Sequence, residues 1–167
     1  YMHLDLNARR NLELTETMRS KEKRGSLLWV LDKTRTAMGK RLIRSWIEQP
    51  LLSPAQILRR QSAVEELVGS AALRDDIAEG LSGIHDLERL MSRIVYGASN
   101  ARELRSLAAA LARLPILQQA LSPAQSSLLA ALREEIDPLE DVRELIDSAI
   151  ADDPPFSVRE GGLIRPG

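Results

Sequence analysis

Apolar side chains recur at intervals of three and four residues through the second half of the chain. They form four series: Ile84, Leu87, Met91 and Ile94; Leu104, Leu107, Leu111 and Leu114; Leu128, Leu132 and Ile136; and Leu139, Val142, Ile146 and Ile150. This spacing places each series on one face of an α-helix. Leucine and alanine dominate while valine and isoleucine are few, which also favours helices over sheet.

Helix-start signals support the same conclusion. Ser53-Pro54-Ala55-Gln56 combines an N-cap serine, a proline at the first helical position and a glutamine at the third. Ser122-Pro123-Ala124-Gln125 repeats these four residues, Asp137-Pro138-Leu139-Glu140 is a variant, and Asn100-Ala101-Arg102-Glu103 lacks the proline. The sequences around the two copies differ, so we interpret them as reused capping chemistry. Each of the four predicts the start of a helix.

The two ends of the chain have a different pattern. Apolar and polar side chains alternate over residues 1–6 and again over residues 11–15, and residues 156–167 have a Gly161-Gly162 pair between two short apolar segments. We therefore predict a mainly α, multi-helix fold with helices across 26–151 and a small β element formed by the N- and C-terminal ends. A sheet joining the ends implies a single domain, 1–167, which we expect to be a fragment of a larger protein.

Composition excludes several classes of site. The chain has no cysteine, so it can form neither disulfides nor thiolate metal sites. No apolar run reaches the roughly 20 residues of a membrane span, and no signal peptide opens the sequence. We expect no membrane association and a cytoplasmic location. The aromatic residues are too few and scattered to form a stacking platform for single-stranded nucleic acid.

The net charge of −1 conceals an imbalance along the chain. Residues 1–60 contain 13 lysines and arginines against 6 aspartates and glutamates, whereas residues 61–167 contain 10 against 18. Such a split can indicate a nucleic-acid-binding face, or two solvated surfaces that bind nothing. The candidate basic residues are Lys33, Arg35, Lys40, Arg41, Arg44, Arg59 and Arg60.

Gly39-Lys40 has some similarity to a phosphate-binding loop. That loop requires the pattern G-x-x-x-x-G-K-[ST] after a strand. Here Thr34 stands in place of the first glycine and Arg41 in place of the hydroxyl residue. The preceding segment instead predicts a short helix capped by Ser26. We expect Thr36 to cap the next helix and Gly39 to pack closely against a neighbouring backbone.

The same helix carries an apolar face. Met38, Leu42 and Trp46 lie four residues apart, and Pro50 ends the helix. We predict that Trp46 is a buried packing anchor.

No residue set predicts catalysis, cofactor binding or metal binding. His3 and His85 lack a partner at metal-ligand spacing, and we interpret Asp5 and Asp86 as surface or capping residues. Seven acidic residues follow helical spacing without a calcium-loop pattern: Glu134, Glu135, Asp137, Glu140, Asp141, Glu144 and Asp147. The predicted sets of catalytic, cofactor-binding and metal-binding residues are therefore empty.

Ordered groups of residues along the chain carry a family resemblance. They are Arg9-Arg10-Asn11-Leu12-Glu13-Leu14; Leu31-Asp32-x-Thr34-x-Thr36-x-Met38-Gly39-x-Arg41, with Trp46 and Pro50-Leu51; Asp86-Leu87-Glu88-Arg89; Pro154-Pro155; and Gly161-Gly162-Leu163-Ile164. This set resembles the first segment of the core (lever) domain of the MutS family of DNA mismatch repair proteins, closest to its bacterial members. The resemblance covers essentially the whole chain.

The resemblance implies a structural role. Members of the family are ATP-hydrolysing dimers that clamp DNA, use magnesium with ATP, and act with a MutL-type partner. Their base-probing Phe-x-Glu motif and their Walker motif lie in other domains, and Phe156 here is followed by Ser157-Val158. The chain is thus expected to be no enzyme by itself, to hold no ATP or magnesium, and to link the nucleotide-binding end to the DNA clamp.

Two alternatives remain: a nucleic-acid-binding helical module that uses the basic first third, and a generic helical protein-interaction domain. Basic residues grouped on one exposed face would favour the nucleic-acid-binding module. An uncovered apolar surface would favour the lever.

Overall fold

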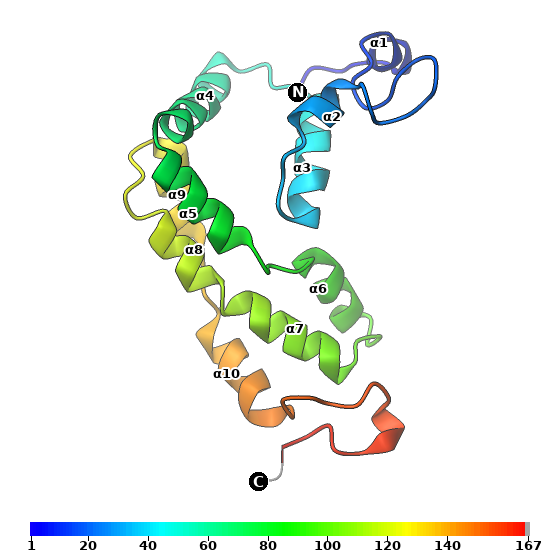
Figure 1. Cartoon of the computed structure of the whole chain (residues 1–167), viewed down its shortest axis with the longest axis vertical. Helices are drawn as coiled ribbons and strands as arrows, with labels where there is room; N and C mark the ends of the chain where they lie inside the picture. Colours follow the sequence, from blue (N-terminus) through cyan, green and yellow to red (C-terminus); the bar gives the residue numbers. More distant parts are fainter. Residues whose placement is uncertain (166–167) are drawn as a thin grey trace. The chain divides into compact units, whose positions relative to one another are not determined.

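The computed structural model describes residues 1–165, apart from the side chain of residue 158, and is helical through most of this range (Figure 1). The helices are α1 (Leu6–Asn11), α2 (Leu27–Leu31), α3 (Ala37–Glu48), α4 (Pro54–Gly69), α5 (Ala71–Leu81), α6 (Leu87–Val95), α7 (Ala101–Leu111), α8 (Leu114–Ala120), α9 (Ser127–Glu135), α10 (Glu140–Ala149) and the short 3-10 helix η1 (Val158–Glu160). The predicted mainly α class is confirmed.

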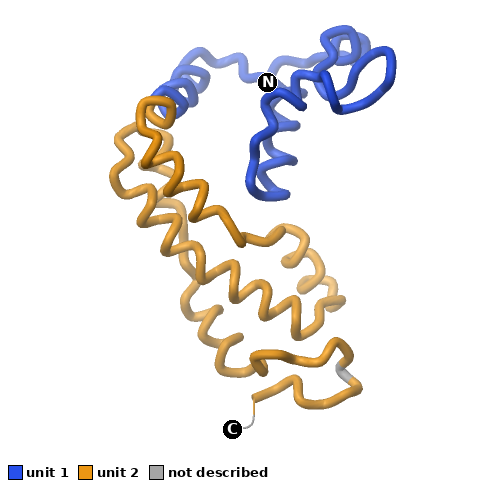
Figure 2. Tube along the Cα trace, viewed as in Figure 1, with its two compact units in different colours: residues 1–65 blue, residues 66–167 orange. Residues whose placement is uncertain are grey.

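The chain forms two compact units, residues 1–65 and residues 66–167, and the boundary falls inside α4 (Figure 2). The expectation of a single domain across residues 1–167 stays a prediction, because a division by contacts does not measure cooperative unfolding.

In unit 1, residues 13 and 14 pair with the start of α2. The amides of Leu27 and Leu28 donate to the carbonyls of Glu13 and Leu14 at 3.1 and 2.9 Å. Leu14 and Leu28 are buried here, and Ser26, which caps α2 as predicted, is fully buried. The first unit therefore has a small core where residues 13 and 14 meet the start of α2.

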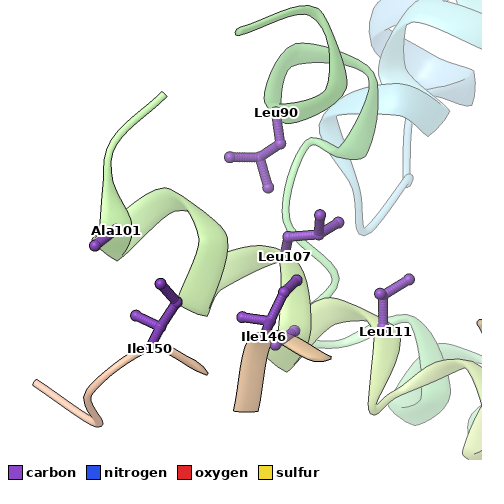
Figure 3. Packing of buried hydrophobic residues seen from close by; sticks show 7 residues of the cluster. Leu90, Ala101, Leu107, Leu111, Ile146 and Ile150 are labelled. Carbon is purple, nitrogen blue, oxygen red and sulfur yellow. The ribbon is translucent and has the colours of Figure 1, made fainter. Parts of the chain in front are cut away.

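The main core of unit 2 lies between α6, α7 and α10 (Figure 3). Leu107 and Leu111 of α7 pack with Leu90 of α6 and with Ile146 and Ile150 at the end of α10. Burying each such side chain stabilises the fold by about 1.5–3 kcal/mol. The α7 series is confirmed, and so are Val142, Ile146 and Ile150 of the α10 series, whereas Leu139 is 40% exposed.

Two of the predicted apolar series are correct only in part. Ile84 is buried, and Leu87 and Ile94 pack against the core, as predicted. Leu90 is buried where the pattern predicted Met91, and Leu129 is buried where it predicted Leu128 and Leu132. Met91 and Leu132 are exposed.

The predicted helix starts at residues 53–56 and 100–103 are correct. Helix α4 begins at Pro54. At α7 the capping box is complete, because Asn100 accepts from the Glu103 amide and Glu103 accepts from the Asn100 amide. Glu103 also pairs with Arg93 at 2.5 Å, and this ion pair, with the Asn100 amide, lowers the pKa of the Glu103 carboxyl.

The second Ser-Pro-Ala-Gln sequence does not begin a helix. Residues 121–123 form a turn, residues 124 and 125 are in an irregular segment, and α9 begins at Ser127. The Glu66 carboxylate at the end of α4 accepts hydrogen bonds from the amides of Gln125 (2.6 Å) and Ser126 (2.8 Å). Hydrogen bonding from Ser126 and Gln125 lowers the pKa of Glu66. Glu66, which is 60 positions from Ser126 in the sequence, thus accepts hydrogen bonds from the backbone amides just before α9.

Helix α10 also begins later than predicted, at Glu140. The Leu139 amide donates to the Asp137 side chain at 3.0 Å, and Leu139 has a left-handed conformation with φ of 49°. The local Asx turn competes with the helix at this point.

The predicted strands at the N-terminal end are wrong. Residues Leu6–Asn11 form α1, and the Asp5 side chain caps it by accepting from the Ala8 amide at 2.6 Å. A capping aspartate inside a short alternating run favoured the helix over the strand.

The β element is smaller than predicted and has a different partner. Over residues 1–165 the β pairing is an isolated antiparallel bridge between Ile150 and Ile164. The Ala151 amide donates to the Leu163 carbonyl and the Arg165 amide to the Ala149 carbonyl, both at 2.9 Å. The C-terminal segment thus pairs with the end of α10 and not with the N-terminal end. The last two residues of the predicted strand region lie outside the described residues.

Candidate functional site on helices α3 and α4

The turn that leads into α3 is built around Asp32. Its carboxylate accepts from Lys23 Nζ at 2.5 Å, from Thr34 Oγ1 at 2.6 Å and from the Thr34 amide at 3.3 Å. The Asp32 side chain is 5% exposed. The Lys23 ammonium, followed by Thr34, lowers its pKa to about 2. Asp32 therefore stays ionised near neutral pH and fixes the turn.

Gly39 lies in the first turn of α3. Thr36 caps the helix as predicted, because its Oγ1 accepts from the Gly39 amide at 3.0 Å. A Cβ added at Gly39 would lie 3.1 Å from Thr36 Oγ1 and 3.2 Å from Thr34 Cβ. The close neighbours are thus threonine side chains, and the expected close approach of another backbone is wrong. The helix α2 precedes this turn, as predicted.

The apolar face of α3 is largely uncovered within the described residues. None of the residues of α3 is fully buried, although its apolar side chains lie together on one face. Leu42 is 52% exposed and Trp46 is 37% exposed. The prediction that Trp46 is a buried anchor is therefore wrong.

Trp46 is instead covered on one face by a cation. The Arg60 guanidinium carbon lies 3.5 Å from the centre of the Trp46 ring, which is a cation–π geometry. The contact shields part of the ring, and Trp46 remains 37% exposed. The contact joins the end of α3 to the middle of α4.

Helix α4 carries an uncovered apolar stripe of its own. Ile57, Val64 and Val68 are exposed and lie seven and four residues apart, so they share one face with Arg60. This stripe was not among the predicted apolar series, although its spacing is present in the sequence. We call the exposed apolar side chains Leu42, Trp46, Ile57 and Val64, which lie on these two helices in unit 1, the uncovered apolar set.

The seven candidate basic residues do not form one free surface. Arg44 pairs with Glu48 at 2.9 Å and Arg60 covers Trp46, so both are engaged. Arg41 and Arg59 also make polar or electrostatic contacts. Lys33, Arg35 and Lys40 are exposed, and within residues 1–165 none of their three side chains has a polar partner.

Comparison with known proteins identifies the family. The family model of MutS domain III matches residues 7–166. The chain belongs to the MutS domain III family. It is 50% identical over its whole length to the DNA mismatch repair protein MutS of Lachnoclostridium phytofermentans, and 49% and 47% identical to those of Symbiobacterium thermophilum and Desulforamulus reducens. It spans 18% of the first of these relatives and 19% of the other two, so it corresponds to one segment of a longer protein.

In this MutS domain III chain, the two histidines lie on the surface. His3 and His85 are exposed, Asp5 caps α1, and Asp86 accepts from the Arg89 amide at the start of α6. In the described range, no group of three or more His, Asp or Glu side chains could hold a metal ion.

The acidic residues near α9 and α10 are exposed to solvent, as predicted, except Asp147, which is partly buried. Asp147 binds Arg105 of α7 at 2.5 Å and lies 3.6 Å from Arg143, so it ties α10 to α7. None of the helices within residues 1–165 is both long and apolar enough to cross a membrane.

Proposed function

We propose that this chain is the core (lever) segment of a DNA mismatch repair protein, linking its nucleotide-binding end to its DNA clamp. The uncovered apolar set supports this proposal. A helix with one apolar face and no fully buried residue is a surface that other parts of a longer protein can cover. The other parts of the proposal come from the resemblance to MutS. Other domains of the longer protein bind ATP with magnesium and hold the DNA. The longer protein is a cytoplasmic homodimer that acts with a MutL-type partner.

The test compares the same substitution in two contexts. In the 167-residue chain, Leu42→Ala should lower the free energy of unfolding by only about 0.5 kcal/mol, because Leu42 is exposed. In a full-length MutS protein that carries this segment, Leu42 should be covered, and the same substitution should lower the free energy of unfolding by about 2–5 kcal/mol. Lys40→Ala, off the apolar face, is the control and should be neutral in both.

The lever role also predicts an effect on coupling. ATP should accelerate DNA release less in the full-length Leu42→Ala protein than in the parent, while the affinity for ATP stays unchanged. Measurement of DNA dissociation rates with and without ATP checks this. An equally small loss of stability in both contexts, with unchanged coupling, would refute the proposal.

A second candidate function rests on Lys33, Arg35 and Lys40. These side chains are exposed without polar partners, and residues 1–65 hold 13 lysines and arginines against 7 acids, a net charge of +6. They could contact nucleic-acid phosphates, and each contact adds about 0.9 to the salt dependence of binding to duplex DNA.

Fluorescence anisotropy with matched and mismatched duplexes at several salt concentrations tests this candidate. Replacing all three residues with glutamine should reduce the salt slope by about 3, equally for both duplexes. An unchanged slope would exclude these residues as the phosphate contacts.

A further inference from the structure

A cavity in unit 2 lies between α5 and α8. Its volume is about 420 Å³, within the range of about 300–1,000 Å³ of small-ligand pockets. Helix α5 contributes Asp76 and Glu79, α8 contributes Ile116 and Gln119, and Pro123 lies in the turn after α8.

The close packing of the two helices positions this cavity. A Cβ added at Gly80 of α5 would lie 3.1 Å from the Cα of Leu117 on α8. The backbones thus approach closely at Gly80, while the longer side chains of the preceding turn of α5 face the cavity beside α8. Asp76 and Glu79 are three residues apart and share one face of α5.

The charge of the lining is negative and only partly balanced. Arg113 donates to the Glu79 carbonyl at 2.6 Å and its guanidinium lies 3.5 Å from Glu79 Oε1. Asp76 is exposed and has no hydrogen bond or ion pair with any described residue. The cavity therefore offers one unpaired carboxylate and a second that is shared with an arginine.

The apolar part of the lining fits the stem of a long side chain. Ile116 is 46% exposed, and Pro123 lies at the same cavity. Arginine and lysine side chains cover apolar surface with their methylene stems while their charged heads reach polar groups. The arginine guanidinium also matches a carboxylate with two parallel hydrogen bonds, which the lysine ammonium cannot do.

We propose that this cavity binds an arginine side chain presented by an apolar peptide segment of a partner protein. The guanidinium donates to the Asp76 carboxylate with Glu79 beside it, and the neighbouring apolar side chains of the peptide pack on Ile116 and Pro123. The negative lining disfavours phosphate groups, so the partner is a polypeptide and not a nucleic acid. This proposal is independent of the proposed lever function.

The probe for this proposal is an acetylated and amidated leucyl-arginyl-leucine peptide. Its control peptide carries citrulline, the neutral isostere, in place of arginine. Both are titrated into the 167-residue chain, and amide chemical shifts are followed by NMR. The arginine peptide should shift the amides of Ile116 and Gln119 saturably, and the citrulline peptide should bind at least about fivefold more weakly, because it lacks a charge-assisted hydrogen bond.

Two matched variants separate the cavity from the general charge of the unit. Asp76→Asn should weaken binding of the arginine peptide at least about fivefold. Asp75→Asn removes the same charge from the neighbouring position, which is outside the lining, and should change the affinity less than about twofold. Equal binding of the citrulline peptide would show an apolar groove only and overturn the proposal. Equal weakening by both variants, shifts located elsewhere, or no saturable binding would also overturn it.

Discussion

The Arg60 guanidinium stacks on the Trp46 ring at 3.5 Å, and this is the contact that joins α3 to α4 in unit 1. Trp46 is only partly buried, so its removal does not leave a core cavity. The contact itself is worth about 0.5–2 kcal/mol. The contribution of Trp46 to stability thus comes from a surface stack as well as from partial burial.

We expect Trp46→Ala to lower the free energy of unfolding of the chain by about 1–3 kcal/mol, less than the 3–5 kcal/mol or so of a core tryptophan. Trp46→Phe, which keeps an aromatic face for Arg60, should lose less. Urea unfolding of the three proteins measures the difference. Lys40→Ala is the control and should stay within about 0.5 kcal/mol. A larger loss for Lys40→Ala than for Trp46→Ala would contradict the structural role assigned to Trp46.

The capping contact of Glu66 should depend on pH. Glu66→Gln removes the charge that accepts from Gln125 and Ser126, so we expect a lower urea midpoint at pH 7. The pKa of Glu66 is lowered in the folded chain from its ordinary 4.5. The folded state is therefore stabilised above pH 4.5, and this stabilisation is lost as the pH falls below it.

The measurement is urea unfolding of parent and variant between pH 7 and pH 3, in which the difference should shrink at the acid end. Glu65→Gln is the matched control, because it removes the same charge from an exposed neighbouring residue. A difference that stays constant with pH, or an equal effect of Glu65→Gln, would contradict the role of this carboxylate.

The core of unit 2 should respond to a cavity at its centre. Leu107 is 6% exposed and packs between α6 and α10, so Leu107→Ala should cost about 2–5 kcal/mol. Leu145→Ala makes the same chemical change on the exposed side of α10 and should cost at most about 0.5 kcal/mol. Thermal or urea unfolding distinguishes the two. Similar losses would show that the face of α10 has been assigned incorrectly.

Two helical glycines should respond in opposite directions. Gly80→Val places side-chain atoms against the backbone of Leu117 and should destabilise the chain by about 1–3 kcal/mol. Gly69, at the end of α4, has no atom within 4 Å of an added Cβ. Gly69→Ala should therefore be neutral or stabilise by up to about 1 kcal/mol. If Gly80→Val were tolerated in urea unfolding, α5 and α8 would not pack as closely as described.

Local chemistry was sufficient to predict the starts of α2, α3, α4 and α7. Ser26, Thr36 and Asn100 cap their helices through contacts within three residues, which sequence alone contains. The second Ser-Pro-Ala-Gln sequence failed because Glu66, distant in the sequence, takes the amides of Gln125 and Ser126. That competition is tertiary and leaves no local signal.

The burial of individual faces was predicted less well. The period of three and four identified the apolar face of α3, but periodicity does not say whether a neighbour covers that face. Trp46 therefore was assigned to a core that the described residues do not provide. The cavity at Asp76 also had no sequence signal, since it depends on the close approach of Gly80 to Leu117.

Helix α4 sets a limit on how the chain can be divided for study. Arg60, before the boundary between the units, stacks on Trp46, and Glu66, after it, caps the start of α9. Ending a recombinant fragment before α4 removes the cation from the tryptophan, and starting one after α4 exposes the amides of Gln125 and Ser126. Two pieces that each include residues 54–69, and therefore overlap, keep both contacts within an intact α4 helix.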